Sequence, residues 1–550
     1  MVAVSLYASL AAILATRVHG QTWCGKNYMA SSPIVPPGGQ FPTPATSADP
    51  LVVFRCAPAI RPYLPEDVLT PAAFIIDTPL THSKVVDAQA ISLPAHGAPG
   101  SLAVTISVAG HILAIGNVPL NATKFEIPFT LAGLKPQSNA YDVSCSAVYA
   151  PIGAKPQRFA ASSALSFLPS PPKGRSVTKM DLRTGALLAK PATGAGGPYE
   201  SVFPIGFYTD FGGYLASNLT LLDDLKAQGF TVVHPVPTFD NLTALDAVLD
   251  RMQELGLYLM YDMRWTYMNS TAVTEEVNRI KNRPNLLLWY TGDEPDGTSD
   301  PLNATSQSYD LIYSLDGYHP VSLVLNCENY YFTEYTAGSD IVMQDTYMIG
   351  NNVTFSSQWG TVCTPDYGDC GCDNCKGSFE DISTRMDEFA ERLWADGWDR
   401  TKAVWTVPQA FGDDTYWKRQ PTGQEYVVQA VLGINHGGLG VVAWNDPTTP
   451  DIKASASLLA KSLSTMKQFI LNPSAKFSHV VVNRVDVGIW SVGAQTLVLA
   501  TNLNYAQVTV NLDGLLPKGV VEKQVLDSGA KVQGKQLVFQ SVGTGAFILS

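Results

Sequence analysis

The sequence predicts a central (β/α)8 TIM barrel flanked by N-terminal and C-terminal β-sandwich domains. The chain has 550 residues, more than one hydrophobic core usually supports, so two or three domains are expected. Its middle part alternates eight strand-like apolar runs with helix-like stretches, which is the pattern of a closed parallel barrel. Both outer parts contain short apolar runs separated by Gly, Pro and Asn, which is typical of antiparallel sandwiches.

The eight runs of the middle part define the barrel strands. They are 203–209, 231–235, 258–263, 286–291, 321–325, 341–344, 404–407 and 440–444. Helix-like stretches lie between most of them, at 219–228, 242–255, 270–282, 383–396 and 424–436. We therefore expect a barrel over 176–472, preceded by a sandwich and linker over 21–175 and followed by a sandwich over 473–550.

The start of the chain and its cysteines indicate secretion. Residues 1–20 contain an apolar run that is too short to span a bilayer and end in small residues, as a signal peptide does. Six Asn-x-Ser/Thr sequons and eight cysteines agree with a secreted, extracellular glycoprotein with disulfide bonds. The spacing Cys363-x6-Cys-x-Cys-x2-Cys375 also fits a metal knuckle, but secretion favours disulfides that staple the long excursion between strands six and seven.

Composition and charge restrict the possible partners. The net charge of −12 argues against nucleic acid and anionic membranes, and no later stretch is long and apolar enough for a membrane helix. No glycine-rich phosphate loop and no Ser or Cys nucleophile motif stands out, so no cofactor and no metal is expected. Neutral polymers such as polysaccharides are compatible with this composition. The sequence does not indicate an oligomeric state.

The active site of such a barrel lies at the carboxyl ends of its strands, so the residues there form the predicted site. Strand four ends in the run Asn285-Leu-Leu-Leu-Trp-Tyr-Thr-Gly-Asp-Glu-Pro-Asp296, where an apolar segment delivers two adjacent acids. Across the strand ends, the candidate residues are Tyr208, Asp262, Arg264, Trp265, Asp293, Glu294, Asn326, Glu328, Asp345, Tyr347, Gln409, Trp444 and Asp446. Aromatic rings that stack on sugar faces, together with acids and amides that bind hydroxyls, describe a carbohydrate site.

The segment Trp289-Tyr-Thr-Gly-Asp-Glu-Pro295 resembles the acid/base motif of the barrel glycoside hydrolases, commonly Asn-Glu-Pro at the end of strand four. The resemblance covers the barrel and its flanking sandwiches without identifying a family. It implies glycosidic bond hydrolysis, with Glu294 as the proton donor to the leaving oxygen. That role needs a carboxyl that is protonated near working pH, and a neighbouring Asp293 charge would help to raise its pKa.

Two departures from that motif leave the second catalytic group open. Retaining members carry a nucleophilic Glu at the end of strand seven, where this chain has Gln409, and Asp293 replaces the usual Asn. The Asp-Glu pair resembles the substrate-assisted N-acetylhexosaminidases of families 20 and 123, in which Asp orients the substrate's acetamido group. Alternatively, Asp345 or Glu328 serves as base or nucleophile. The separation of the carboxyls would then distinguish inversion, at about 6.5–9.5 Å, from retention, at about 5–5.5 Å.

Each of these residues also has a purely structural interpretation. A Gly-Asp-Glu-Pro segment can cap a helix with Pro295 in its first turn, Asp293 can pair with Arg264, and tryptophans at strand ends are often core residues. His234 is expected to be a hydrogen-bonded barrel histidine. A rival function follows from Gln409, namely a catalytically inactive carbohydrate-binding or wall-associated protein on a hydrolase scaffold.

Overall fold

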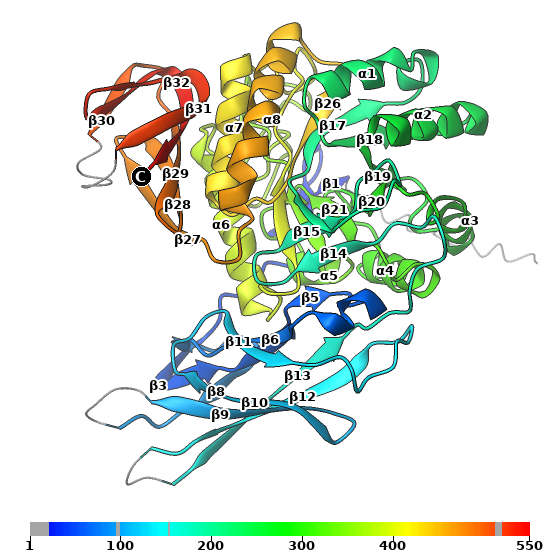
Figure 1. Cartoon of the computed structure of the whole chain (residues 1–550). Helices are drawn as coiled ribbons and strands as arrows, with labels where there is room; N and C mark the ends of the chain where they lie inside the picture. Colours follow the sequence, from blue (N-terminus) through cyan, green and yellow to red (C-terminus); the bar gives the residue numbers. More distant parts are fainter. Residues whose placement is uncertain (1–20, 95–99, 152–154, 512–519) are drawn as a thin grey trace, which may run out of the picture.

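The protein consists of a central barrel, a group of N-terminal sheets and a C-terminal sheet (Figure 1). The computed structural model describes residues 21–94, 100–151, 155–511 and 520–550, so the expected signal peptide over 1–20 lies outside the described residues. The N-terminal sheets lie below the barrel in Figure 1, and the C-terminal sheet packs against the side formed by α6, α7 and α8. Among the described helices, none is long and apolar enough to cross a membrane.

The barrel is closed by eight parallel strands in chain order, which confirms the predicted fold class. Every observed boundary lies within two residues of the predicted one, because the apolar runs that marked the strands are buried on both faces. The strands are β17 (Ile205–Asp210), β18 (Val232–Val236), β19 (Tyr258–Asp262), β20 (Leu286–Asp293), β21 (Val321–Leu325), β22 (Ile341–Gln344), β25 (Ala403–Thr406) and β26 (Val441–Asp446).

The helices pack around the barrel and begin and end at residues that satisfy their free backbone groups. Asn241 caps α2 by accepting a hydrogen bond from the Ala244 amide at 3.0 Å, and Gly256 ends that helix in the left-handed region. The helices are α1 (Thr220–Ala227), α2 (Leu242–Leu255), α3 (Ser270–Ile280), α4 (Ala304–Leu315), α5 (Phe332–Thr336), α6 (Glu380–Ala395), α7 (Gly423–Asn435) and α8 (Pro450–Ile470).

The N-terminal part contains antiparallel sheets around its own core. A four-stranded sheet of β10 (His111–Pro119), β9 (Ser101–Val108), β12 (Tyr141–Tyr149) and β13 (Gln157–Leu165) faces a three-stranded sheet. The latter contains β11 (Phe125–Phe129), β6 (Ala72–Asp77) and β4 (Arg55–Pro58), and a smaller sheet joins β7 (Leu80–Ser83), β3 (Thr46–Val53) and β8 (Ala88–Ala90). The Cys56–Cys145 disulfide links β4 to β12.

One segment that the sequence analysis placed within the barrel range belongs to another sheet. The strands β14 (Thr178–Asp181), β15 (Ala186–Ala189) and β16 (Glu200–Val202) pair with β5 (Ile60–Arg61) of the N-terminal part. Their side chains pack against barrel residues on one side and N-terminal residues on the other. The barrel itself therefore starts at Ile205, and the preceding strands connect it to the N-terminal sheets.

The C-terminal sheet is held to the barrel by an ionic cluster around the buried Asp486. Asp486 accepts hydrogen bonds from Asn435 Nδ2 at 2.7 Å, His436 Nε2 at 3.0 Å and His479 Nε2 at 2.8 Å, and His436 Nδ1 lies 2.7 Å from Asp387. We call these five residues the latch. The sheet comprises β27 (Lys476–Val482), β28 (Val485–Val492), β29 (Gln495–Asn502), β30 (Val508–Asn511), β31 (Val521–Gln533) and β32 (Gln536–Leu549).

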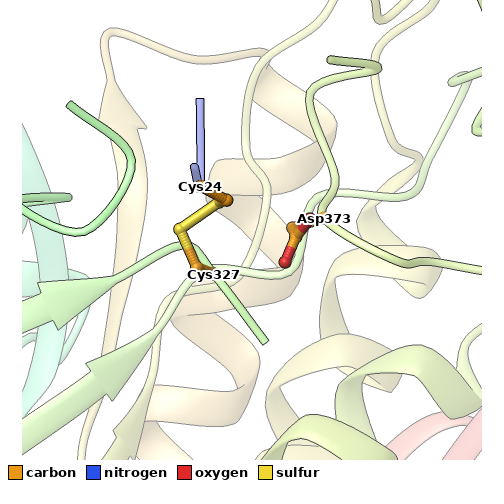
Figure 2. A group of neighbouring side chains, drawn as sticks. All are labelled: Cys24, Cys327 and Asp373. Atoms are coloured by element: carbon orange, nitrogen blue, oxygen red, sulfur yellow. A yellow bond between two sulfur atoms is a disulfide. The ribbon is translucent and has the colours of Figure 1, made fainter. Parts of the chain in front are cut away.

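Residues 21–28 form a strap across the carboxyl end of the barrel. The short strands β1 (Thr22–Trp23) and β2 (Lys26–Asn27) form a hairpin there, and the Cys24–Cys327 disulfide joins the strap to the loop after β21 (Figure 2). Lys26 forms a buried ion pair with Asp373, which lies beside that disulfide. The first described residues are thereby fixed to the end of the barrel where the predicted site lies.

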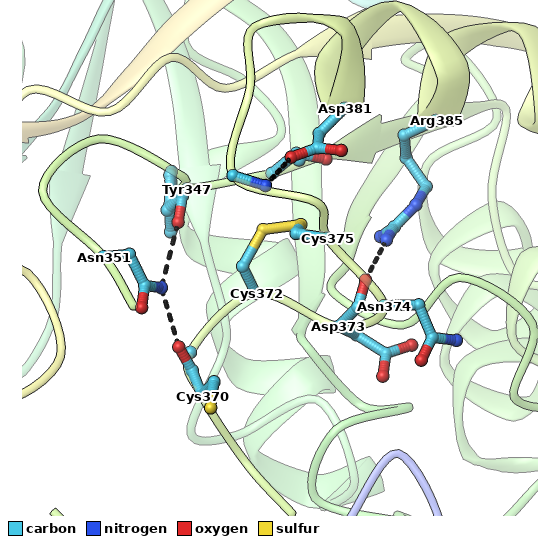
Figure 3. The surroundings of a disulfide bond; sticks show 12 residues. Tyr347, Asn351, Cys370, Cys372, Asp373, Asn374, Cys375, Asp381 and Arg385 are labelled. Carbon is cyan, nitrogen blue, oxygen red and sulfur yellow. Dashed lines mark hydrogen bonds between the residues drawn. A yellow bond between two sulfur atoms is a disulfide. The ribbon is translucent and has the colours of Figure 1, made fainter. Parts of the chain in front are cut away.

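The excursion between β22 and β25 forms a stapled cover, as predicted. It holds the disulfides Cys363–Cys370 and Cys372–Cys375 and the hairpin of β23 (Phe355–Ser356) and β24 (Thr361–Val362). On one side of the second disulfide, the Asn351 amide donates to the carbonyls of Tyr347 and Cys370 (Figure 3). On the other side, Arg385 donates to the Asp373 carbonyl. The disulfide interpretation of these four cysteines is confirmed, and their sulfurs are therefore not free to ligate a metal.

Candidate active site

A cavity of about 420 Å³ opens at the carboxyl ends of the barrel strands. Its floor comes from the barrel, and its walls come from the strap, the stapled cover and the loop after β25. Nine aromatic rings and five carboxylates dominate its surface. The lining residues are Trp23, Tyr28, Tyr208, Asp293, Glu294, Val324, Asn326, Asp345, Tyr347, Trp359, Asp369, Gly371, Phe411, Asp414, Tyr416, Trp417 and Trp444.

Glu294 and Asp345 form a carboxyl pair in the floor of this cavity. The Asn326 amide bridges them, because its Nδ2 donates to Glu294 Oε1 at 2.9 Å and to Asp345 Oδ1 at 3.4 Å. The two carboxyls are also hydrogen-bonded to each other. Glu294 follows β20 with a φ of +52°, a conformation that non-glycine residues adopt at a cost and that is concentrated at functional sites.

The environment of the pair favours the protonated form of its carboxyls. Burial raises the pKa of Glu294, and the Asp293 charge raises it further, against opposing hydrogen bonds from Asp345 and Asn326. Burial also raises the pKa of Asp345 well above its ordinary value, and the adjacent Glu294 charge adds to this shift. Because two buried carboxylates in contact repel each other, the pair titrates as a unit that holds its last proton to a higher pH than a lone carboxyl does.

Asp293 is held differently from its neighbour in the chain. Its Oδ2 lies 2.8 Å from Arg264 Nη1, and its Oδ1 accepts a hydrogen bond from the Tyr290 hydroxyl. Arg264 Nε in turn lies 2.8 Å from Asp262 Oδ2, which is also 2.7 Å from His234 Nε2. Burial lowers the pKa of His234 despite the nearby Asp262 charge, so the imidazole is neutral. As expected, His234 is a hydrogen-bonded barrel histidine.

Asp296 fixes the backbone that carries the bridging amide. Its Oδ1 accepts from the backbone N–H of Gly297 at 2.9 Å and of Asn326 at 3.2 Å, and its Oδ2 accepts from that of Cys327 at 2.8 Å. Burial raises the pKa of Asp296 to about 7, although these backbone bonds oppose the shift. The loops after β20 and β21 are thereby joined directly behind the carboxyl pair.

The strap completes the cavity wall and contacts the cavity floor. Trp23 Nε1 donates to Asn326 Oδ1 at 3.0 Å, so Asn326 is held on both sides of its amide group. The Trp23 ring packs onto Gly297, where an added Cβ would lie 2.4 Å from the indole. A residue near the start of the described chain therefore positions the amide that bridges Glu294 and Asp345.

The structure brings only some of the predicted site residues together. Those that line the cavity are Tyr208, Asp293, Glu294, Asn326, Asp345, Tyr347 and Trp444. Asp262 and Arg264 lie beneath it as ion-pair partners. Whether each lining residue acts on a substrate stays a prediction.

Four predicted site residues point elsewhere. Trp265 is 69% exposed and lines a separate cavity of about 330 Å³. Glu328 accepts from Asn374 Nδ2 at 2.6 Å outside the main cavity. Gln409 is buried and exchanges hydrogen bonds with the backbone of Ile349, and Asp446 pairs with Lys453 at 2.7 Å. Each of these four residues is a correction to the predicted site, because a position at a strand end does not fix the direction of a side chain.

The sequence-based site did not include several cavity residues that the strap, the cover and the loop after β25 supply. These are Trp23, Tyr28, Trp359, Asp369, Phe411, Asp414 and Tyr416. The single available signal was Cys24, since a cysteine in the N-terminal segment must pair with another part of an oxidised chain. Its partner at residue 327 lies directly after Asn326, but disulfide connectivity does not follow from spacing alone.

Two groups of described side chains have the types and spacing of metal ligands. Cys24, Cys327 and Asp373 form one group, but both sulfurs belong to a disulfide (Figure 2). His436, His479 and Asp486 form the other. There, both Nε2 atoms already hydrogen-bond to Asp486, and the group lies at the latch rather than at the cavity.

Comparison with known proteins gives likeness of fold only. No family model matches the sequence, and no curated protein matches it. The matching solved structures include a β-glucuronidase from Ruminococcus gnavus (12% identity, TM-score 0.32), which aligns with 73% of this chain. This chain covers 61% of that glucuronidase.

Two further matched structures each cover somewhat less than two thirds of this chain. A GH30 endoxylanase from Clostridium papyrosolvens matches at 10% identity and a TM-score of 0.38, over 64% of this chain and 97% of its own. An α-amylase from Geobacillus thermoleovorans complexed with acarbose matches at 11% identity and a TM-score of 0.40, over 63% of this chain and 98% of its own. At these identities and TM-scores the matches identify no family for this chain.

Proposed function

We propose that this protein is a secreted glycoside hydrolase that cleaves a polysaccharide or glycan, with Glu294 as general acid/base. One observation carries the proposal: the hydrogen-bonded Glu294–Asp345 pair lies in the floor of an aromatic cavity at the carboxyl end of a (β/α)8 barrel. Carbohydrate cleavage needs a proton donor beside a surface on which sugar rings stack. Both elements are present in this cavity.

The pair supplies the proton that bond cleavage consumes. When the bond between the anomeric carbon and the leaving oxygen breaks, Glu294 gives a proton to that oxygen. Water then adds its hydroxide to the anomeric carbon, and its remaining proton returns to the pair. The raised pKa of both carboxyls keeps this proton on the pair to a higher pH than an ordinary carboxyl would. Asp293, close to the pair, would stabilise positive charge that develops on the sugar.

Asp345 is assigned the role of proton partner rather than nucleophile. A nucleophile and an acid act on opposite sides of the anomeric carbon and need carboxyls about 5–5.5 Å apart or more, whereas these two are in hydrogen-bond contact. Gln409 does not supply a nucleophile either, because its buried amide is bonded to the backbone of Ile349. The attacking group is therefore water or a substituent of the substrate.

Secretion is part of the proposal. All six asparagines of the glycosylation sequons are exposed, at 121, 218, 241, 269, 303 and 352. The eight cysteines form four disulfides, as an oxidising compartment allows. Both observations support an extracellular glycoprotein.

The rival function is a catalytically inactive carbohydrate-binding protein. The observation that favours it is the absence of a carboxylate at the end of strand seven, where Gln409 is buried instead. Binding would use the same aromatic walls without the proton chemistry of the floor.

A panel of polysaccharides and aryl glycosides, with product analysis, tests the proposal. We expect Glu294→Gln to lower the hydrolysis rate by a factor of about 10²–10⁴, because the amide cannot donate an acidic proton. Asp345→Asn is expected to lower the rate less and to shift its pH profile. Glu328→Gln is the matched control, since that carboxylate accepts from Asn374 and does not line the cavity. Unchanged hydrolysis by Glu294→Gln would refute the catalytic assignment, and binding without cleavage by the wild type would establish the rival.

A further inference from the structure

We propose that the cavity is built for a cationic glycan, namely a hexosamine polymer whose 2-amino groups are free. This inference rests on the proposed function, because it names the substrate class of the same site. It is carried by the charge distribution of the cavity. Five carboxylates line it, from Asp293, Glu294, Asp345, Asp369 and Asp414. Among the described residues that line it, there is no lysine, arginine or histidine.

The cations nearest to the cavity are already neutralised. Arg264 lies 2.8 Å from both Asp262 and Asp293, so these three groups together carry one net negative charge. Lys26, on the strap, is buried in an ion pair with Asp373 and donates to Asn374 Oδ1 at 3.0 Å. Even when the Glu294–Asp345 pair retains one proton, the cavity is strongly anionic, so it would attract a polycation and repel a uronic acid polymer.

Asp369 is the clearest fixed acid outside the carboxyl pair. Its Oδ2 accepts from the Tyr416 hydroxyl at 2.6 Å, and its Oδ1 accepts from the Gly371 backbone at 2.9 Å. The Tyr416 hydroxyl also accepts from Trp359 Nε1 at 2.6 Å. Because aromatic residues of the cavity hold this carboxylate in place, it is pre-organised for a ligand and does not pair with a protein cation.

The aromatic walls suit the same ligand. An ammonium group attracted by carboxylates is also attracted to the faces of tryptophan and tyrosine rings, and sugar rings stack on those faces. Trp359, Tyr416 and Trp417 stand beside Asp369 in the wall. The arrangement places charge and stacking surfaces together, as recognition of an aminated pyranose requires.

A free amine also has a consequence for the reaction. An acetamido group can attack the anomeric carbon through its carbonyl oxygen, whereas an ammonium group has no such oxygen and no free electron pair. Water is then the attacking group, and Asp293 contacts the substrate's ammonium instead of orienting an acetamido group. Inhibition by a thiazoline that mimics the acetamido intermediate is therefore expected to be absent.

Matched ligands isolate the effect of the amino-group charge on binding and cleavage. Oligosaccharides of β-1,4-linked glucosamine and of linked galactosamine are each compared with the same oligosaccharide after chemical N-acetylation, which removes the charge and keeps the linkage. Neutral glucose oligomers and glucuronate oligomers complete the set. Binding is measured by calorimetry on Glu294→Gln, and cleavage is measured on the wild-type protein.

We expect at least one free-amine oligomer to bind at least tenfold more tightly than its N-acetylated counterpart, with an affinity that falls as salt increases. Asp369→Asn should reduce that affinity several-fold. Asp366→Asn is the control, because it removes an exposed acid of the same loop that does not line the cavity. Its affinity should stay within twofold of that of the parent.

The outcomes separate this inference from the proposed function. If N-acetylated, neutral or uronic oligomers are cleaved while neither the glucosamine nor the galactosamine oligomer is cleaved, the proposed substrate class is wrong and the hydrolase proposal stands. If nothing is cleaved but an amine oligomer binds, the hydrolase proposal fails and the cationic ligand is supported. If no amine oligomer binds more tightly than its acetylated form, the inference is overturned.

Discussion

The carboxyl pair of the cavity and the latch of the C-terminal sheet are two clusters built around buried acids, and they differ in the groups that face those acids. In the latch, Asp486 receives hydrogen bonds from two imidazoles and an amide. In the cavity, Glu294 and Asp345 face each other, and Asn326 is the shared amide donor. Burial raises the pKa of both cavity acids, whereas the histidine hydrogen bonds outweigh burial and lower the pKa of Asp486 to about 2.

This difference separates a structural cluster from a functional one. A buried acid with enough donors is ionised and holds its surroundings together, and removing it leaves its partners unpaired. A buried acid next to another acid binds a proton more tightly and lowers the stability of the fold. Such an arrangement is retained only where the proton has a function. The following predictions test this contrast through the free energy of unfolding.

Replacing Asp486 by Asn is expected to give the largest loss. The change removes the negative charge that accepts from His436 and His479, so an imidazolium is left buried against a neutral amide. We expect the C-terminal sheet to lose about 3–5 kcal/mol of stability, measured by urea unfolding and by hydrogen exchange of β28.

Asp387→Asn is the matched control for that experiment. Asp387 also pairs with His436, at 2.7 Å, but its side chain is 58% exposed, so its loss should cost less than about 1 kcal/mol. Equal losses in the two variants would contradict the view that the buried side of the latch carries the stability.

Raising the pH should weaken the latch next. Although burial lowers it, hydrogen bonds to Asp387 and Asp486 raise the pKa of His436 to about 9 from its ordinary 6.5. A raised pKa gives stability that is fully present below pH 6.5 and is lost as pH rises through 9, here about 3 kcal/mol. The unfolding midpoint of the C-terminal sheet should fall between pH 7 and pH 10, and a His436→Gln variant should lack this dependence.

Glu294→Gln should give the smallest change, and in the opposite direction. Its Oε1 can still accept from Asn326, and its new amide can donate to Asp345, so the hydrogen bonds persist without the repulsion. We expect stability at pH 7 to rise by about 1 kcal/mol. The gain should shrink near pH 4, where both carboxyls of the wild type are protonated. A loss of stability at pH 7 would show that Glu294 is a structural acid.

The barrel was predictable because its signal is repeated and local. Each strand is a short apolar run buried on both faces, so all eight could be read without knowing their partners. The five helices predicted between them were found as well. Helix α4 (Ala304–Leu315) was missed because polar residues interrupt its apolar spacing.

The site was predictable only where strand geometry fixes it. Glu294, Asp293 and Asp345 line the cavity because they directly follow buried strands. Trp265 and Glu328 follow strands too, but they lie on loops whose course depends on other contacts. The wall residues Trp23 and Asp369 come from segments without periodicity, and the disulfides Cys24–Cys327 and Cys363–Cys370 fix those segments in place.

The Cys24–Cys327 bond also sets an order of assembly. The ribosome releases Cys24 early, whereas its partner follows 303 residues later, so the strap has no docking site while most of the barrel is still being made. Trp23 reaches Asn326 only after the loop behind β21 exists. The newly made chain therefore carries an unfinished cavity until the loop after β21 and the later wall segments have been made, and the hydrolytic capacity proposed above would be withheld until late in biosynthesis.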